Sequence, residues 1–497
     1  LEIWHLDVED FLDLRKNTGD DRRRCHDMNT ALWVCDEFME HVSKEKDWYL
    51  FDPAECPDLH ETYGEEFSKL YKNYKKMADK GEIKSFIKIA AKDLWKKCLK
   101  SLFETGHPWI TFKDPSNIRY SNKHAGVVHS SNLCTEILLH TKPTTYYEGE
   151  VVERGETAVC NLASINLANH VKVRTIDWKK LKETIEVAVR GLDNVIDINF
   201  YPTEEARSSN IKNRPVGLGI MGTHELLHKL GVFYDSKAAV ELCDKVQEFI
   251  SLHAIKTSAL LAKERGTYPT FGGSEWDKGN FPIDTFCELM SERNPREVSN
   301  DKLSFETLDE WDSVRDLVSQ YGMRNSNVMA IAPTATISYI QGCSQSIEPD
   351  YSVLINEHFV TAAKKKGIWS QGLVDALKSV DGDVTALVHL DDSLKEQFKN
   401  AFDMDFHTII DAAAARQKWI DMGQSLNLYN KHESLKYLND MYLYAWEKGL
   451  KTTYYLRSKA ATRLEKSTIS DTNLKNQSII NEERSCSVLD PGCESCQ

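Results

Sequence analysis

The stretch Ser131-Asn132-Leu133-Cys134-Thr135-Glu136-Ile137 places a carboxamide, a thiol and a carboxylate at every second position. Successive side chains of an extended segment point to opposite faces, so Asn132, Cys134 and Glu136 would share one face of a strand. Such a face could hold a substrate hydroxyl group, react beside it and accept its proton. The plainer interpretation is an edge strand with an inert cysteine, because free cysteine often acts as a small core residue. Taken alone, the stretch leaves both interpretations open.

Outside this stretch, strand-like and helix-like patterns alternate along the chain. Short apolar or alternating runs, typical of strands, occur at residues 1–14, 108–112, 158–167, 327–332 and 451–457. Apolar residues at helical spacing predict helices at residues 176–199, 218–231, 234–265, 402–421 and 432–448. This alternation predicts an α/β fold, either a barrel or a wound sheet. Polar composition at 465–497 predicts a flexible tail after a folded region at 1–464.

The 497-residue chain has 41% hydrophobic residues and a formal net charge of −14. The acidic balance argues against a general nucleic-acid binder, which would present a basic face. A small anionic substrate stays possible, because backbone N–H groups can bind phosphate inside an acidic protein. No run approaches the roughly 20 apolar residues of a membrane span, and no secretory signal precedes the 12 scattered cysteines. We therefore expect a cytoplasmic protein with reduced thiols and no membrane partner.

A hydroxyl-rich segment, Pro333-Thr334-Ala335-Thr336-Ile337-Ser338, follows one of the strand-like runs. If it opens a helix, its free N–H groups and hydroxyls could bind a phosphate group. Ordinary capping of the helix by threonine or serine is the alternative.

The glycines of Val216-Gly217-Leu218-Gly219-Ile220-Met221-Gly222 have the spacing G-x-G-x-x-G of a dinucleotide-binding loop. No clear strand precedes them, and a single match of this kind is weak. The glycines indicate instead a close approach of two backbones.

Several residues could carry redox chemistry. Tyr454 and Tyr455 are adjacent phenols, which are either core or interface aromatics or a relay for an oxidising equivalent. Cys493 and Cys496 form a C-x-x-C pair that suits thiol–disulfide exchange better than zinc binding, because no second Cys/His pair lies nearby. Cys160 lies in an apolar run and by itself resembles a buried inert cysteine.

Together these stretches resemble the large, catalytic subunit of class I ribonucleotide reductases. They occur in the family's order and span nearly the whole chain. The matching segments are Ser131–Ile137, Ala158–Leu167, Asn213–Gly222, Ala332–Ser338 with Ser346-Ile347-Glu348-Pro349, Lys451–Ser458 and the terminal Cys493-Glu494-Ser495-Cys496.

The resemblance implies an α/β barrel of ten strands in two halves, with a finger loop inside that carries Asn132, Cys134 and Glu136. On that loop Cys134 would become a thiyl radical and abstract hydrogen from the ribose C3′. Glu136 would accept the proton of the 3′-hydroxyl, and Asn132 would hold substrate hydroxyls. The 2′-hydroxyl would leave as water, so that a ribonucleoside diphosphate becomes a deoxyribonucleoside diphosphate.

The resemblance also assigns the other candidates. Cys160 would be one of two reducing thiols, and Cys493 and Cys496 would reduce the resulting disulfide. Tyr454 and Tyr455 would relay the radical, with Tyr454 nearer Cys134. The substrate diphosphate would be held by Pro333, Thr334, Ala335, Thr336 and Ile337.

Partners follow from the same resemblance. A small subunit would generate the radical with its own metal-linked cofactor, so we expect no metal or cofactor in this chain. Thioredoxin or glutaredoxin would reduce the tail, and the full large subunit would form a homodimer. The second reducing cysteine and most sites for ATP and deoxynucleotide effectors would precede the segment that resembles Leu1–Leu14, on a separate or missing N-terminal half.

Three other interpretations compete. A cobalamin-dependent reductase would need no inter-subunit relay, so the two tyrosines argue against it. A non-catalytic, reductase-like protein would only dock a small subunit or nucleotides. A thiol–disulfide oxidoreductase would use only the C-terminal cysteine pair.

Overall fold

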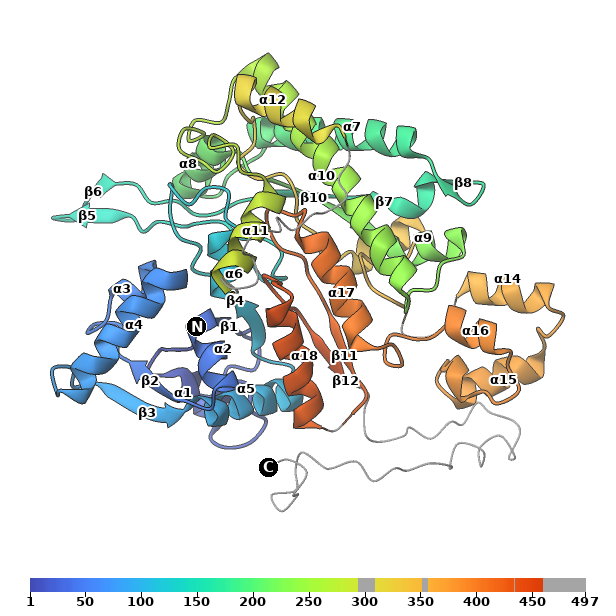
Figure 1. The fold of residues 1–497 in the computed structure, drawn as a ribbon, viewed down its shortest axis with the longest axis horizontal. Coiled ribbons are helices and arrows are strands. Elements are labelled where there is room, and N and C mark those ends of the chain that lie inside the picture. The colour runs from blue at the N-terminus through green and yellow to red at the C-terminus, as the bar shows by residue number, and fades with distance from the viewer. Residues whose placement is uncertain (294–308, 351–355, 433, 459–497) are drawn as a thin grey trace.

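The computed structural model describes residues 1–293, 309–350, 356–432 and 434–458. The parallel strands lie in the interior and helices surround them, which confirms the α/β class, while the hairpin of β5 (Thr145–Tyr147) and β6 (Glu150–Glu153) projects outward (Figure 1). The predicted tail at 465–497, with Cys493 and Cys496, lies outside the described residues. Within the described part of the chain, no helix combines the length and apolar character needed to cross a membrane.

Three short ladders of parallel strands form the interior. β7 pairs with β10 over six residues, from Asn161 opposite Val216 to Asn166 opposite Met221. The other two ladders join β1 with β4 and β11 with β12. Their bounds are β1 (Ala31–Val34), β4 (Trp109–Phe112), β7 (Asn161–Asn166), β10 (Val216–Met221), β11 (Leu428–Asn430) and β12 (Leu456–Ser458).

Single bridges connect these ladders. Leu218 of β10 pairs in parallel with Met329, and Ile331 pairs in parallel with Gln424, just before β11. Thr111 of β4 pairs with Thr452 in the antiparallel sense. The interior therefore consists of two groups of parallel segments. The two groups run in opposite directions and pair with each other at Thr111 and Thr452.

The expected ten-stranded barrel is not seen as such. The described residues form six separate two-stranded ladders and no closed barrel, so the strand count is not confirmed. The three ladders not yet described are antiparallel, and the last two of them are hairpins. They join β2 (Asp47–Phe51) with β3 (Phe86–Ala90), β5 (Thr145–Tyr147) with β6 (Glu150–Glu153), and β8 (Val171–Lys172) with β9 (Thr175–Ile176).

One of the sequence predictions fails locally, and the disfavoured dinucleotide-loop alternative is excluded. Residues 1–14 form bridges only at Glu2 and His5 and then turn into helix α1 (Val8–Asp13), so they are not one strand. Gly217 and Gly219 lie inside strand β10, whereas a dinucleotide loop requires them after a strand. A Cβ atom on Gly219 would lie 2.6 Å from the Ala330 carbonyl oxygen, so the glycine permits close approach of two strands, as predicted.

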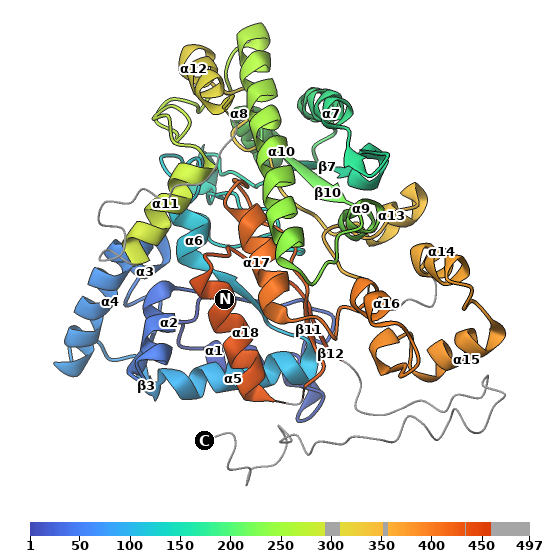
Figure 2. The same cartoon turned by 45° about the vertical axis from the view of Figure 1, so that its right-hand side comes forward.

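The longest helix, α10 (Lys237–Arg265), packs across the strands and is buried along much of its length (Figure 2). Ser236 caps it, because the Ser236 hydroxyl accepts from the Ala239 N–H at 3.2 Å. Its neighbours include α7 (Trp178–Ile198), α12 (Trp311–Tyr321) and α17 (Phe406–Gln417). The helices predicted at 176–199, 234–265 and 402–421 are thus confirmed as α7, α10 and α17.

One apolar core runs from Ile3 to Leu456 and joins the two ends of the described chain. Helix α5 (Ala91–Thr105) lies against α18 (Leu435–Glu447), where the Trp95 indole donates to the Asn439 side chain at 3.0 Å. A separate, smaller apolar cluster lies in a unit of three helices at the right of Figure 1. The unit consists of α14 (Glu357–Lys365), α15 (Gln371–Ser379) and α16 (Asp392–Gln397).

The remaining helices are short or lie at the periphery. Two of them are used below: α9 (Thr223–Leu230), which follows β10, and α13 (Ala335–Gln341). The others are α2 (Asp36–Ser43), α3 (Asp58–Glu61), α4 (Gly64–Asp79), α6 (Lys113–Ile118), α8 (Glu204–Asn213) and α11 (Pro282–Arg293).

Candidate active site

The stretch around Cys134 is a tight loop rather than a strand. The Asn132 carboxamide oxygen accepts from the Ile137 N–H at 3.0 Å, and the Thr135 N–H donates to the Asn132 carbonyl. Leu133 lies at the exposed tip, with 56% of its surface accessible. The predicted common strand face is therefore wrong, because the Asn132 side chain bonds the backbone and closes a turn.

The base of this loop is fixed to two segments of the interior. The Thr135 hydroxyl donates to the Thr453 carbonyl at 3.2 Å, and the Gly423 N–H donates to the Glu136 carbonyl at 2.8 Å. Thr135 has a φ of 69°, a conformation that costs a β-branched residue about 1–3 kcal/mol. A Cβ atom on Gly423 would lie 2.8 Å from the Thr135 carbonyl oxygen, so a glycine is needed there.

Ser425 is a site residue that the sequence did not reveal. Its hydroxyl oxygen lies 2.5 Å from the Cys134 carbonyl oxygen and 3.1 Å from a carboxylate oxygen of Glu136. A hydroxyl has one proton, so it can serve only one of these acceptors at a time. Ser425 therefore links the position of Glu136 to that of the Cys134 backbone.

Tyr454 contacts the Cys134 thiol, and Tyr455 contacts Tyr454. The Tyr454 hydroxyl donates to the Cys134 sulfur at 3.5 Å, and the centroids of the two phenol rings lie 4.2 Å apart. The Trp109 ring lies 4.8 Å from Tyr454 and 5.4 Å from Tyr455, measured between centroids. Trp109 supports both rings, a role that its place in a strand-like run did not indicate.

Tyr455 borders an open groove of about 550 Å³. Phe402, Leu456, Arg457 and Ser458 also line this groove. The Arg457 guanidinium lies 5.6 Å from the centroid of the Tyr455 ring. The order from the groove to the sulfur is therefore Tyr455, Tyr454 and Cys134.

Burial raises the pKa of the reacting groups. It raises the pKa of the Cys134 thiol, although the hydrogen bond from Tyr454 opposes the shift. Burial also raises the pKa of Tyr454 and that of the Glu136 carboxyl group. A cysteine with a raised pKa is a poor thiolate nucleophile but retains the S–H bond that hydrogen-atom transfer requires.

Cys160 lies immediately before β7 and packs against the cluster that contains Ile137, Leu138 and Leu139. Burial, together with the charges of Asp421 and Glu136, raises the pKa of its thiol. The structure thus brings Cys160 to the apolar side of the Cys134 loop.

The segment Pro333–Ile337 begins beside the same loop. The Ile331 carbonyl accepts from the Ser425 N–H at 2.9 Å, so Ser425 contacts both the start of this segment and Glu136. Helix α13 begins at Ala335, and no side chain caps it. The Thr334 hydroxyl instead accepts from the Ser346 N–H at 2.7 Å. Ordinary capping by Thr334 is therefore excluded, and the first three residues of the helix, Ala335, Thr336 and Ile337, are exposed.

Glu348, in the neighbouring Ser346–Pro349 motif, is buried and bonded to strand β11. It accepts a hydrogen bond from the Tyr429 hydroxyl, and burial raises its pKa to about 7.

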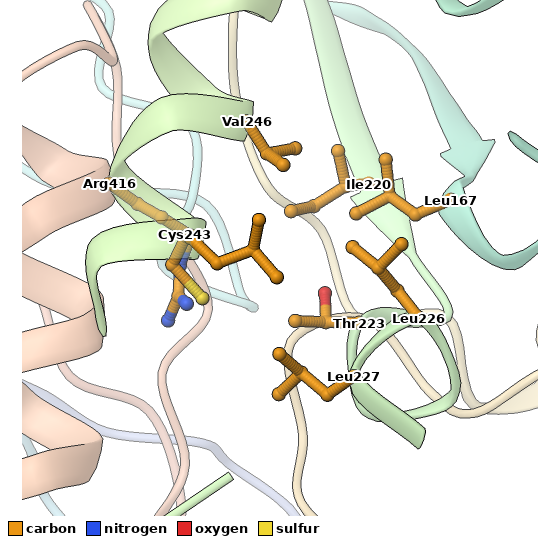
Figure 3. A pocket seen from close by; sticks show the side chains of 9 residues that line it. Leu167, Ile220, Thr223, Leu226, Leu227, Cys243, Val246 and Arg416 are labelled. Carbon is orange, nitrogen blue, oxygen red and sulfur yellow. The ribbon is translucent and has the colours of Figure 1, made fainter. Parts of the chain in front are cut away.

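An apolar cavity between β10, α9 and α10 is too small to be a substrate site (Figure 3). Its volume is about 10 Å³, no more than one water molecule requires. Its lining consists of Leu167, Ile220, Thr223, Leu226, Leu227, Leu242, Cys243, Val246 and Arg416.

Comparison with known proteins gives a consistent result. A family model described as "Ribonucleotide reductase, barrel domain" matches residues 1–456. The chain is 50% identical to the ribonucleoside-diphosphate reductase subunit alpha of Chlamydia muridarum, an alignment that covers all of the chain. It is 42% identical to the subunit alpha of Helicobacter pylori over 94% of the chain, and 35% identical to the large subunit of Arabidopsis thaliana over 97%.

The chain spans only part of these relatives. The alignments cover 49% of the Chlamydia protein, 61% of the Helicobacter protein and 59% of the Arabidopsis protein.

Proposed function

Because the chain belongs to the ribonucleotide reductase barrel-domain family, we propose that it carries the ribose-reducing site of a class I large subunit. Its substrates would be ribonucleoside diphosphates and its products deoxyribonucleoside diphosphates. The observation that carries this proposal is the hydrogen bond from Tyr454 to the Cys134 sulfur, with the tilted ring of Tyr455 in contact with that of Tyr454.

The radical would enter from a partner small subunit with a metal-linked cofactor, which would oxidise Tyr455 at the groove. Tyr455 would then oxidise Tyr454. The Tyr454 oxyl would take a hydrogen atom from the Cys134 S–H bond, which re-forms the phenol and leaves a thiyl radical. The raised pKa of Cys134 supports this step, because the hydrogen atom must still be on the sulfur.

The thiyl radical would abstract the hydrogen at the ribose C3′ and re-form the S–H bond. Glu136 would accept the proton of the 3′-hydroxyl while Asn132 holds the sugar hydroxyls. The 2′-hydroxyl would then leave as water. Glu136 suits this role because burial raises its pKa and because Ser425 holds its carboxylate.

Two thiols must supply two electrons and two protons and form a disulfide; one proton leaves with the 2′-hydroxyl as water and the other goes to the sugar. Cys160 would be one of them, and the second is expected on the part of the relatives that this chain does not span. Cys493 and Cys496 would reduce that disulfide by thiol exchange, and thioredoxin or glutaredoxin would reduce the tail.

The substrate diphosphate would bind at Pro333, Thr334, Ala335, Thr336 and Ile337. The uncapped start of α13 supports this assignment, because backbone N–H groups at a helix start attract anions. The two opposed groups of parallel segments suit the family's ten-stranded barrel in two halves. A homodimer and effector sites for ATP and deoxynucleotides would require the N-terminal region of the relatives.

The decisive test is nucleoside-diphosphate reduction with dithiothreitol and the small subunit, with and without the N-terminal region of a relative. Activity that requires all components and is lost in Cys134→Ser would establish the proposal. A correctly folded chain that binds the small subunit but never reduces substrate would favour the non-catalytic docking protein. Thiol–disulfide exchange activity that is lost in Cys493→Ser but retained in Cys134→Ser would favour a thiol–disulfide oxidoreductase.

A further inference from the structure

Two histidines and an aspartate converge outside the proposed active site. His224 and His228 lie one turn apart on α9, and Asp350 approaches them from a distant part of the chain. Asp350 Oδ2 lies 3.4 Å from His224 Nδ1 and 3.8 Å from His228 Nε2. One ligand atom from each of the three residues lies within 4.8 Å of the others.

The hydrogen-bonding of these histidines is incomplete. Only 2% of either imidazole side chain is exposed. Within the described residues, neither ring nitrogen of His228 has a hydrogen-bond partner. The Nε2 atom of His224 has none there either. Buried polar atoms nearly always have a partner, and an ion is one recognised explanation when they do not.

The spacing of these ligand atoms suits a tetrahedral ion. Zinc binds imidazole nitrogen and carboxylate oxygen at about 2.1 Å, which separates neighbouring ligand atoms by roughly 3.4 Å. The residues also form the sequence His224-Glu225-Leu226-Leu227-His228, the H-E-x-x-H pattern that places two histidines on one helical face.

We propose that His224, His228 and Asp350 bind a divalent transition-metal ion of the zinc type. The ion would bind His224 at Nδ1 and replace the hydrogen bond that the Asp350 N–H now donates there at 2.8 Å, so that this amide must shift. Of the unpartnered nitrogens, the ion would therefore provide a partner for one on His228. A fourth position would be filled by water or by His358, whose ring centroid lies 5.1 Å from that of His228.

The arrangement indicates a structural ion rather than a hydrolytic one. In metalloproteases with this pattern the glutamate acts as the general base. Here Glu225 forms an ion pair with Lys229 at 2.9 Å and lies 3.9 Å from His358. The His228 ring also stacks on Phe398 of the α14–α16 unit, so the ion would fasten that unit to α9.

Other metal ligands must be removed before the test. The terminal cysteines can bind metal, and His60, Glu61 and His129 form a second, more exposed group. The background chain therefore carries Cys493→Ser, Cys496→Ser and His129→Gln. Co²⁺ serves as the probe, because its absorption distinguishes tetrahedral nitrogen and oxygen ligation from thiolate ligation.

We expect the background chain to bind one equivalent of Co²⁺ with a tetrahedral spectrum that lacks thiolate bands. His228→Gln and Asp350→Asn should each weaken binding at least about tenfold. His253→Gln is the matched control, since His253 is also buried with an unpartnered Nδ1 but belongs to neither metal-ligand group. It should bind Co²⁺ as the background chain does.

Absence of stoichiometric binding in the background chain would overturn the proposal, as would a thiolate spectrum or equal binding in both ligand variants. If His228→Gln does not fold, Asp350→Asn decides, because it keeps the shape of a side chain that is 29% exposed. In the background chain, Zn²⁺ should also raise the temperature of unfolding, and the two ligand variants should lose that shift.

Discussion

Cys134 and Tyr454 are the residues whose direct contact carries the proposed chemistry. Cys134→Ser should abolish nucleotide reduction, because the hydroxyl O–H bond is too strong for a phenoxyl radical to break. Substrate binding and folding should persist, since the two side chains are similar in size. Turnover and nucleotide affinity, measured in parallel, test this prediction. Cys287→Ser is the control, because Cys287 is a half-buried thiol outside the site and its loss should leave turnover intact.

Tyr454→Phe should remove activity while it costs no more than about 1 kcal/mol of stability, the usual net value of one neutral hydrogen bond. The reason is that phenylalanine fills the same space but cannot exchange a hydrogen atom with Cys134. Tyr442→Phe removes another buried phenol, which has no hydrogen-bond partner among the described residues. Equal loss of turnover in the two variants would refute a specific relay through Tyr454.

Ser425 should act through the pKa of Glu136. Its hydrogen bond stabilises the carboxylate and lowers the pKa, against the rise that burial causes. Ser425→Ala should therefore raise the pKa further, so that a higher pH is needed to form the proton-accepting carboxylate. We expect the acidic limb of kcat/KM to move up by about one pH unit. If the acidic limb of the kcat/KM profile does not move and only the plateau of the profile falls, Ser425 has only a structural role.

At the scale of elements, the contact between β10 and the segment around Ala330 limits what glycine can be replaced with. In Gly219→Ala the new Cβ atom would lie 2.6 Å from the Ala330 carbonyl oxygen, and we expect a loss of about 1–3 kcal/mol in the free energy of unfolding. Gly191→Ala, in the interior of α7 with open space around it, should stabilise the protein by up to about 1 kcal/mol. Chemical denaturation should therefore give a lower free energy of unfolding for Gly219→Ala and a higher one for Gly191→Ala than for the unchanged chain.

Elements with a regular apolar period were predictable from sequence, and those closed by side-chain hydrogen bonds were not. The period of α7 reflects burial of one helical face, which the sequence records directly, whereas the middle of α10 is buried on all sides and is apolar enough to be recognised as a helix. The sequence of the Cys134 loop predicts a strand because two kinds of side chain alternate along it. Its shape depends on the Asn132 side chain and on Thr453, which lies more than 300 residues away along the chain.

The same limit applies to the site as a whole. The residue types at Cys134, Glu136 and Tyr454 suggested chemistry, but only the family resemblance predicted that they belong to one site. Cys134 and Tyr454 are 320 positions apart in the sequence. Ser425 and Trp109 have no local signal, since each acts through a partner that is distant in sequence. The metal-ligand pattern at His224–His228 was readable locally, whereas its third ligand, Asp350, depends on the fold.

For the whole molecule, the two apolar clusters predict uneven stability. The main core continues from Ile3 to Leu456, whereas the α14–α16 unit has a small cluster of its own. In metal-free protein, amide hydrogens at 356–398 should exchange faster than those of α10, because less apolar surface opposes their local opening. Hydrogen exchange followed by mass spectrometry tests this, and equal protection in both regions would contradict it.

The burial of Cys134 and Cys160 also affects how the protein ages. Peroxide attacks thiolates, so cysteines with a raised pKa, such as Cys134 and Cys160, should be oxidised slowly. An environment that would preserve the hydrogen atom of the proposed radical transfer would thus also protect the sulfur from irreversible damage. Oxidative stress should consume exposed thiols such as Cys25 before Cys134.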